Sequence, residues 1–349
     1  MTTINKNNKL GYVASLDGFR AIAVMLVILT HANFYLGKNG KIGVSMFFTL
    51  SGFLITTLLL EEYKKNNRVS FIGFYIRRTM RLFPALYTLL AFVMVYILFF
   101  KTQTDQHIIF KELLSAAFYV NNISWYWGWG NNALLLGHTW SLAVEEQFYL
   151  IWPWILVISM KLRSLLPLQY GLIFFILISW FFKANGIYPN IVGSLIEESI
   201  FIGCLGALLR WNHLIPKIPS FVSISSFLCI LIVGVLEINL PFNFFNPCAI
   251  LSIIIIIGII NNSEGAILNR FLSNKTMVFL GKISYSLYLW HVVIFRLFKW
   301  HSTLPQHLSF IAKFVFTFIM AIGSWFLIEK KGTLLGRKWS GRLEKKQIS

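Results

Sequence analysis

The chain contains ten long apolar stretches, separated by charged residues, prolines and clusters of Asn and Gly. A helix needs about 20 predominantly apolar residues to cross the hydrocarbon core of a bilayer, with roughly 17 to 25 tolerated. The stretches therefore predict an all-α fold, a polytopic membrane helix bundle of about ten transmembrane helices. They cover residues 20–36, 42–60, 82–100, 140–160, 168–182, 192–209, 221–237, 247–261, 282–299 and 309–328.

The composition excludes the common water-soluble classes of protein. Charged residues make up 13% of the 349 residues, whereas a soluble domain has roughly 25%. So few charges cannot cover a water-facing surface of this size, and disordered, collagenous or coiled-coil chains need polar or repetitive sequences. A further apolar segment, 113–129, contains Asn121 and Asn122, so we expect an interfacial or re-entrant segment there rather than a span.

Basic residues are distributed unevenly around the predicted spans. With ten spans both termini lie on one side, and the segments on that side hold 23 of the 31 Lys and Arg residues, against 6 on the other side. By the positive-inside rule, this bias places both termini in the cytoplasm of a multi-pass protein of the cell inner membrane. The net charge of +18 then reflects orientation and contact with anionic membrane lipids, and we expect no nucleic-acid partner.

The sequence shows no internal repeat, low-complexity tract or linker, so we expect one integral-membrane domain over residues 1–349 with a basic cytoplasmic tail at 329–349. Three cysteines, Cys204, Cys229 and Cys248, lie far apart in apolar stretches without metal-ligand spacing. We therefore expect neither a disulfide framework nor a metal site. The sequence does not define an oligomeric state.

Ionisable residues inside spans are costly and indicate functional sites. Arg20 and His31 are eleven residues apart in DGFRAIAVMLVILTHANF, so a helix places them on one face, about 16 Å apart along its axis. Arg20 then lies at the cytoplasmic mouth and His31 in the outer half of the bilayer. An anchoring arginine and a hydrogen-bonded core histidine would explain the same pattern.

A second group of polar residues is the arginine cluster of Arg77, Arg78 and Arg81 beside Pro84. Arg78 and Arg81 share a helix face, and planar, permanently charged guanidinium groups suit phosphate recognition. An ordinary positive-inside cluster is the alternative explanation.

A third group lies in HTWSLAVEEQFYLIWPW, where His138, Ser141 and Glu145 share one helix face. Two adjacent acids, Glu145 and Glu146, enter this span, and a helix-dipole role accounts for one of them more readily than for both. Ser141 can also be a simple helix cap.

The fourth group lies in GKISYSLYLWHVVIF, where Ser284, Tyr288 and His291 share a face and His291 is near mid-membrane. Glu197 and Glu198, at the outer start of another span, extend this set of polar residues.

Six motifs, in order along the chain, resemble the integral-membrane acyltransferase-3 family, the O-acetyltransferases of cell-surface glycans. They are LDGFRAIAV with the Arg20–His31 spacing, GVSMFFTLSGFLIT, IRRTMRLFPALY, HTWSLAVEEQFYLIWPW, FIGCLGALL and LGKISYSLYLWH. The resemblance implies acetyl-CoA as a donor on the cytoplasmic side and a glycan or glycolipid hydroxyl as the acceptor on the outer face. Members can carry a C-terminal extracytoplasmic hydrolase-like domain, and we expect none here.

The resemblance also implies site residues. His31 would be the essential histidine, and the arginines Arg20, Arg77, Arg78 and Arg81 would serve the donor. We expect a neutral His31 to take the proton of the acceptor hydroxyl, with Glu145 or Glu146 orienting it. In a variant, His31 or Ser141 carries the acetyl group transiently. The acceptor would meet the side chains of His138, Trp140, Tyr288 and His291.

Two other functions fit part of the pattern. A transporter or flippase of lipid-linked sugars would also bury His and Glu residues, and a non-enzymatic scaffold would need no Arg20–His31 pair. Substrate-dependent release of CoA distinguishes the enzyme from a transporter, and tolerance of His31→Gln in cells would favour the scaffold.

Overall fold

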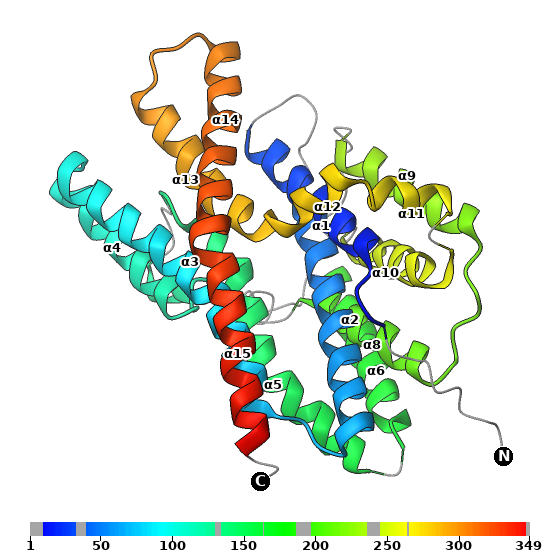
Figure 1. Cartoon of the computed structure of the whole chain (residues 1–349). Coiled ribbons are helices and arrows are strands. Elements are labelled where there is room, and N and C mark those ends of the chain that lie inside the picture. Colours follow the sequence, from blue (N-terminus) through cyan, green and yellow to red (C-terminus); the bar gives the residue numbers. More distant parts are fainter. Residues whose placement is uncertain are drawn as a thin grey trace.

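The structure is a computed structural model that describes residues 10–32, 40–129, 134–162, 164–185, 197–235, 245–263 and 265–346. Within these residues every regular element is helical (Figure 1). In chain order the elements are α1 (Ala14–His31), α2 (Lys41–Asn66), α3 (Phe71–Phe100), α4 (Gln103–Ala117), the 3-10 turns η1 (Ser124–Trp127) and η2 (Gly137–Thr139), α5 (Trp140–Lys161), α6 (Leu166–Ala184), α8 (Glu198–Trp211), α9 (Ser220–Val235), α10 (Phe245–Asn261), α11 (Ile267–Leu272), α12 (Lys275–Lys282), α13 (Ser284–His301), α14 (Gln306–Ser324), the π-helical turn η4 (Trp325–Glu329) and α15 (Lys330–Lys346).

The helical class is as predicted, but ten full-length spans are not seen in the described residues. Six helical segments are long and apolar enough to cross a membrane, and the pair α12 and α13, bent by 66°, can form a seventh. The remaining predicted stretches correspond to shorter helices, α8, α9 and α10. Part of the stretch 192–209 lies outside the described residues.

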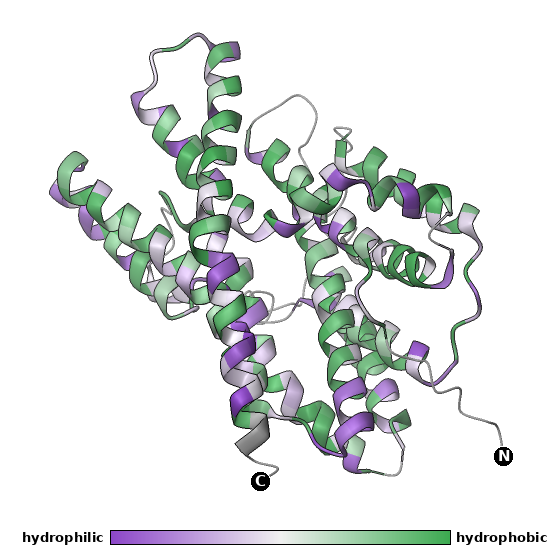
Figure 2. Cartoon of the chain, viewed as in Figure 1, coloured by the Kyte–Doolittle hydropathy of each residue, from purple (hydrophilic) through white to green (hydrophobic). Residues whose placement is uncertain are grey.

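The C-terminal residues, where we expect a basic cytoplasmic tail, are helical as far as Lys346. Helices α14 and α15 join through η4 into one nearly straight column beside α3 (Figure 1). At 1.5 Å per residue, a 38-residue helical segment is about 57 Å long, which exceeds the roughly 30 Å of bilayer hydrocarbon. Hydrophilic residues gather along α15 and at the lower end of α2 (Figure 2).

Helix α15 packs closely on α3 because it presents glycine to it. A Cβ atom at Gly332 would lie 2.2 Å from the Met80 carbonyl oxygen, and one at Gly336 would lie 2.9 Å from the Met80 side chain. Only a residue without a side chain allows this approach. This contact holds α15 against the part of α3 that carries Arg77, Arg78 and Arg81.

Helix α4 runs back along α3 instead of crossing on its own. Near its start the Gln106 side chain donates to the Ile97 carbonyl, and near its end the Ala117 carbonyl accepts from Tyr87. The chain therefore turns at residue 118 beside the middle of α3. No single helix covers residues 113–129, and the interfacial or re-entrant position expected for this segment stays a prediction.

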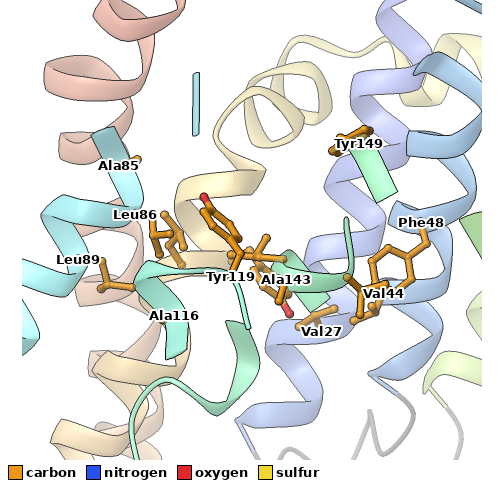
Figure 3. Packing of buried hydrophobic residues seen from close by; sticks show 14 of the residues in the cluster. Val27, Val44, Phe48, Ala85, Leu86, Leu89, Ala116, Tyr119, Ala143 and Tyr149 are labelled. Carbon is orange, nitrogen blue, oxygen red and sulfur yellow. The ribbon is translucent and has the colours of Figure 1, made fainter. Parts of the chain in front are cut away.

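The apolar core around this turn joins α3, α4 and α5 to α1 and α2. Tyr119 and Ala143 lie in the middle of the cluster, with Leu86 of α3 on one side and Val27 and Phe48 on the other (Figure 3). This packing fixes the helices that carry the polar side chains described next.

Candidate active site

A cavity of about 150 Å³, lined by apolar side chains as well as charged and polar ones, lies among α1, α2, α3, α5 and α13. Three of the four predicted donor-binding arginines line it, Arg20, Arg78 and Arg81. The fourth, Arg77, lies outside the lining, with its Nη2 atom 3.6 Å from a carboxylate oxygen of Glu62. The other polar side chains that line the cavity are Ser51, Ser141, Glu145, Tyr149, Ser284, Tyr285 and Tyr288.

Arg78 is held by acids and by an aromatic ring. Its Nε atom donates to Glu146 Oε1 at 2.9 Å, and its Nη2 atom lies 3.4 Å from Glu145 Oε1. The guanidinium carbon lies 3.4 Å from the ring centroid of Tyr149. Glu145 also accepts hydrogen bonds from Ser51 and, at 2.6 Å, from the Tyr149 hydroxyl. The charge of Arg78 is thus compensated within the protein.

Arg20 and Arg81 differ from Arg78 in their partners. Arg20 Nη1 donates to Asp17 at 2.9 Å, and Asp17 also accepts from the Tyr12 hydroxyl at 2.8 Å. Desolvation and this hydrogen bond raise the pKa of Tyr12 to about 12, so the phenol remains a donor at neutral pH. Among the described residues, no carboxylate forms an ion pair with Arg81. Glu329 interacts with it electrostatically, but at longer range and without a hydrogen bond. Arg81 is therefore the cavity cation most available to an anionic ligand.

Three histidines meet beyond the cavity. His31, at the exposed end of α1, lies next to the fully buried His291 of α13, with ring centroids 5.0 Å apart. His138, in η2, also lies next to His291, at 5.4 Å between centroids. Sequence reasoning assigned these residues to the site from three separate motifs, and the fold brings them together.

Contacts with backbone carbonyls show which ring nitrogen carries the hydrogen in neutral His31 and His291, because a carbonyl oxygen can only accept a hydrogen bond. His31 Nδ1 lies 2.9 Å from the Val27 carbonyl, so Nδ1 carries the hydrogen and Nε2 retains its lone pair. By the same reasoning His291 Nδ1 donates to the Tyr288 carbonyl at 2.7 Å, which leaves its Nε2 as an acceptor. His31 therefore presents an unprotonated Nε2, the form that a general base requires.

Tyr288 connects the cavity to the histidines. Its hydroxyl lies 2.6 Å from Ser141 Oγ and donates to the His138 carbonyl at 2.8 Å, while its own carbonyl accepts from His291. The cavity wall and the histidine cluster thus share one residue of α13.

One predicted arrangement differs from the structure. Glu145 and Glu146 were expected to orient His31, but both carboxylates face Arg78 instead, because α5 presents them to α3 rather than to the end of α1. Trp140 packs edge to face on Phe48, at 6.2 Å between centroids, and its contact with the acceptor stays a prediction.

Several side chains of the site were not identified from the sequence. Tyr149 follows Glu145 by four residues, which is one helical turn, so its position in the motif was a usable signal. Ser51 lies within a quoted motif but carries no local signal of its own. Glu329 was assigned to the tail, yet it is buried and accepts from Ser286 Oγ at 2.9 Å.

These features define the class of protein: a polytopic membrane helix bundle with an available guanidinium in an interior cavity and, beyond that cavity, a histidine with an unprotonated Nε2. A family model described as "Acyltransferase domain" matches residues 13–330. The chain belongs to this acyltransferase family.

Three proteins of similar sequence have names that are consistent with this family. The peptidoglycan O-acetyltransferase OatA of Listeria monocytogenes is 33% identical over 347 residues, which cover 91% of this chain and 55% of the relative. The putative peptidoglycan O-acetyltransferase YrhL of Bacillus subtilis is 32% identical, over 91% of this chain and 54% of the relative. A putative O-acetyltransferase of Staphylococcus aureus strain COL is 34% identical, over 83% and 52%. The chain thus spans about half the length of these relatives, and no solved structure matches it.

Proposed function

We propose that the protein is an O-acetyltransferase of the cell inner membrane, which moves an acetyl group from cytoplasmic acetyl-CoA to a hydroxyl of a cell-surface polysaccharide or glycolipid precursor. The observation that carries the proposal is that Tyr288 lines the same cavity as Arg81, and that the Tyr288 carbonyl accepts from His291, which lies next to His31. The printed names of two relatives favour peptidoglycan as the first acceptor to test.

The donor phosphates would bind at the arginine end of the cavity. The N–H donors of the Arg81 guanidinium are available to a ligand. Arg20 lies nearby on α1, and its Nη1 atom already donates to Asp17. Guanidinium groups bind phosphate with two parallel hydrogen bonds, which fixes the orientation as well as the affinity. The interval between Arg20 and His31, about 16 Å along α1, matches a donor whose thioester lies at the end of a long arm.

In the transfer step the acceptor oxygen attacks the thioester carbonyl carbon, and His31 Nε2 takes the hydroxyl proton. The carbon–sulfur bond then breaks, and the CoA thiolate receives a proton from the His31 imidazolium. His291 Nε2, 3.4 Å from His31 Nδ1, would stabilise that imidazolium, a role that an acid has in a catalytic triad. In the covalent variant, His31 or Ser141 carries the acetyl group between the two substrates.

The test uses the purified protein in proteoliposomes with radiolabelled acetyl-CoA and a peptidoglycan or polysaccharide acceptor. We expect label on the acceptor and stoichiometric CoA release with the wild-type chain, and neither with His31→Ala. His307→Ala is the matched control, because His307 is an exposed histidine at the start of α14. Label retained on the protein supports the covalent variant. Full transfer by His31→Ala, or CoA release by no form of the protein, would contradict the proposal and favour transport.

A further inference from the structure

The carboxylate of Glu112, in α4, binds the main chain of residues 134–136, which leads into the candidate active site. Its side chain is almost fully buried, at 2% exposure. One carboxylate oxygen accepts from the backbone N–H of Leu134, and the other accepts from Leu135 at 3.0 Å and from Leu136 at 2.6 Å. A single carboxylate thus satisfies three consecutive backbone donors, each of which would be costly to bury alone.

The segment that Glu112 binds is not part of a regular helix, so its backbone groups depend on side chains. The Leu136 carbonyl accepts from Asn121 Nδ2 at 2.8 Å, and the same amide donates to Thr139 Oγ1 at 2.6 Å. Irregular backbone within a membrane bundle persists only where the protein provides such partners. Both backbone polar groups of Leu136 are therefore fixed, its N–H by Glu112 and its carbonyl by Asn121 and Thr139.

This segment leads directly into the candidate active site. Two residues after Leu136, the His138 carbonyl accepts from the Tyr288 hydroxyl, and His138 Nε2 donates to the Leu289 carbonyl at 3.1 Å. Ser141 follows within the next turn and lies 2.6 Å from the Tyr288 hydroxyl. A displacement of the Leu134–Leu136 backbone would therefore displace the residues that join the cavity to the histidines.

We propose that Glu112 is a positioning residue for acyl transfer, which fixes the main chain before His138 and thereby sets the geometry of His138, Ser141 and Tyr288 at the end of the donor cavity. This inference rests on the proposed function, because it assigns a catalytic consequence to that geometry. It assigns Glu112 no contact with either substrate.

The substitutions Glu112→Gln and Glu112→Asp test the proposal. Glutamine keeps the size but replaces one accepting oxygen by an NH₂ group that faces backbone donors, whereas aspartate keeps both acceptors on a shorter stem. We expect Glu112→Gln to lower kcat for acetyl transfer by about tenfold or more, because small misplacements of reacting groups are costly. The KM for acetyl-CoA should stay within about twofold, because the arginines lie on other helices. Glu112→Asp should recover part of kcat.

Asp105→Asn is the matched control, since Asp105 lies on the same helix with its side chain 38% exposed. Hydrogen exchange of the backbone amides of residues 134–136 gives a readout that does not depend on activity, and we expect it to accelerate in Glu112→Gln and not in Asp105→Asn. Unchanged exchange would overturn the positioning role even if the wild-type chain transfers no acetyl group. A lower melting temperature with normal kcat per folded molecule would also overturn it, since it would indicate a structural role alone. An inactive wild-type chain with accelerated exchange would contradict the proposed function and not the contact.

Discussion

His291 Nε2 lies 3.4 Å from His31 Nδ1, and the two rings meet edge to face at 71°. In this contact His291 is the acceptor. Its Nδ1–H donates a hydrogen bond to the Tyr288 carbonyl, so its Nε2 carries the lone pair. His291 is fully buried, so water cannot easily replace it. His291 therefore provides a neutral, fixed acceptor next to His31, the proposed base. We had expected Glu145 or Glu146 in this role.

The first prediction concerns this acceptor. His291→Phe keeps an aromatic ring of similar shape but removes the nitrogen, so the His31 imidazolium keeps only the Val27 carbonyl as an acceptor at Nδ1. We expect kcat for acetyl transfer to fall by about tenfold, the effect of one lost hydrogen bond to a charged group, with little change in the KM for acetyl-CoA, because His31 itself remains as the base. Initial rates at saturating donor measure the effect.

His301→Phe provides the comparison, since His301 lies on the same helix α13 but contacts Tyr96, at 2.6 Å, rather than the cluster. Wild-type kcat in His291→Phe would show that His31 acts without His291.

The second prediction separates the arginines of the cavity. Arg81→Lys keeps the charge but loses the paired donors, so we expect the KM for acetyl-CoA to rise by about tenfold with kcat less affected. Arg68→Ala, at an exposed position between α2 and α3, should leave both parameters unchanged. An equal rise in KM for both variants would mean that the basic surface, and not Arg81, attracts the donor.

The sequence predicted the helical class and most of the residues that the fold gathers, because ionisable side chains in apolar stretches are rare and conspicuous. Spacing on one helix was informative in part: Ser141 and Glu145 both line the cavity, whereas His138, expected on the same face, lies in the turn η2 before α5. Partners on different helices were not predictable in the same way. Nothing in the order of residues shows that Glu146 pairs with Arg78, since that depends on how α5 is rotated against α3.

Location in the chain did not show how the C-terminal segment is built. Residues 329–349 are basic and follow the last apolar stretch, which indicates a cytoplasmic tail but not its conformation. In the structure the helix continues through Glu329, and Gly332 packs on α3. Glu112, in turn, acts on backbone atoms more than twenty residues away, a contact that has no sequence signature.

The third prediction concerns stability. Removing Glu146 leaves Arg78 in a nearly buried position with only Glu145 as its acid, so we expect Glu146→Ala to destabilise the fold by about 2 kcal/mol. Replacing both Arg78 and Glu146 by alanine should cost less than the sum of the single substitutions, because the charge is removed together with its partner. Unfolding in detergent measures the double-mutant cycle. Strict additivity would mean that the 2.9 Å contact contributes nothing.

The fourth prediction tests whether α15 is part of the donor site. Gly332→Leu forces side-chain atoms against the Met80 carbonyl, so α15 must move from α3, at a cost of about 1 to 3 kcal/mol. Because Met80 immediately precedes Arg81, we expect a higher KM for acetyl-CoA as well as a lower melting temperature. Gly341→Ala is the matched control on the same helix: no atom lies within 4 Å of its Cβ position, and alanine favours the helix by up to about 1 kcal/mol. It should raise the melting temperature and leave the KM unchanged. If Gly332→Leu leaves both quantities at wild-type values, α15 is not seated on α3, and the C-terminal segment is the free tail that its composition first indicated.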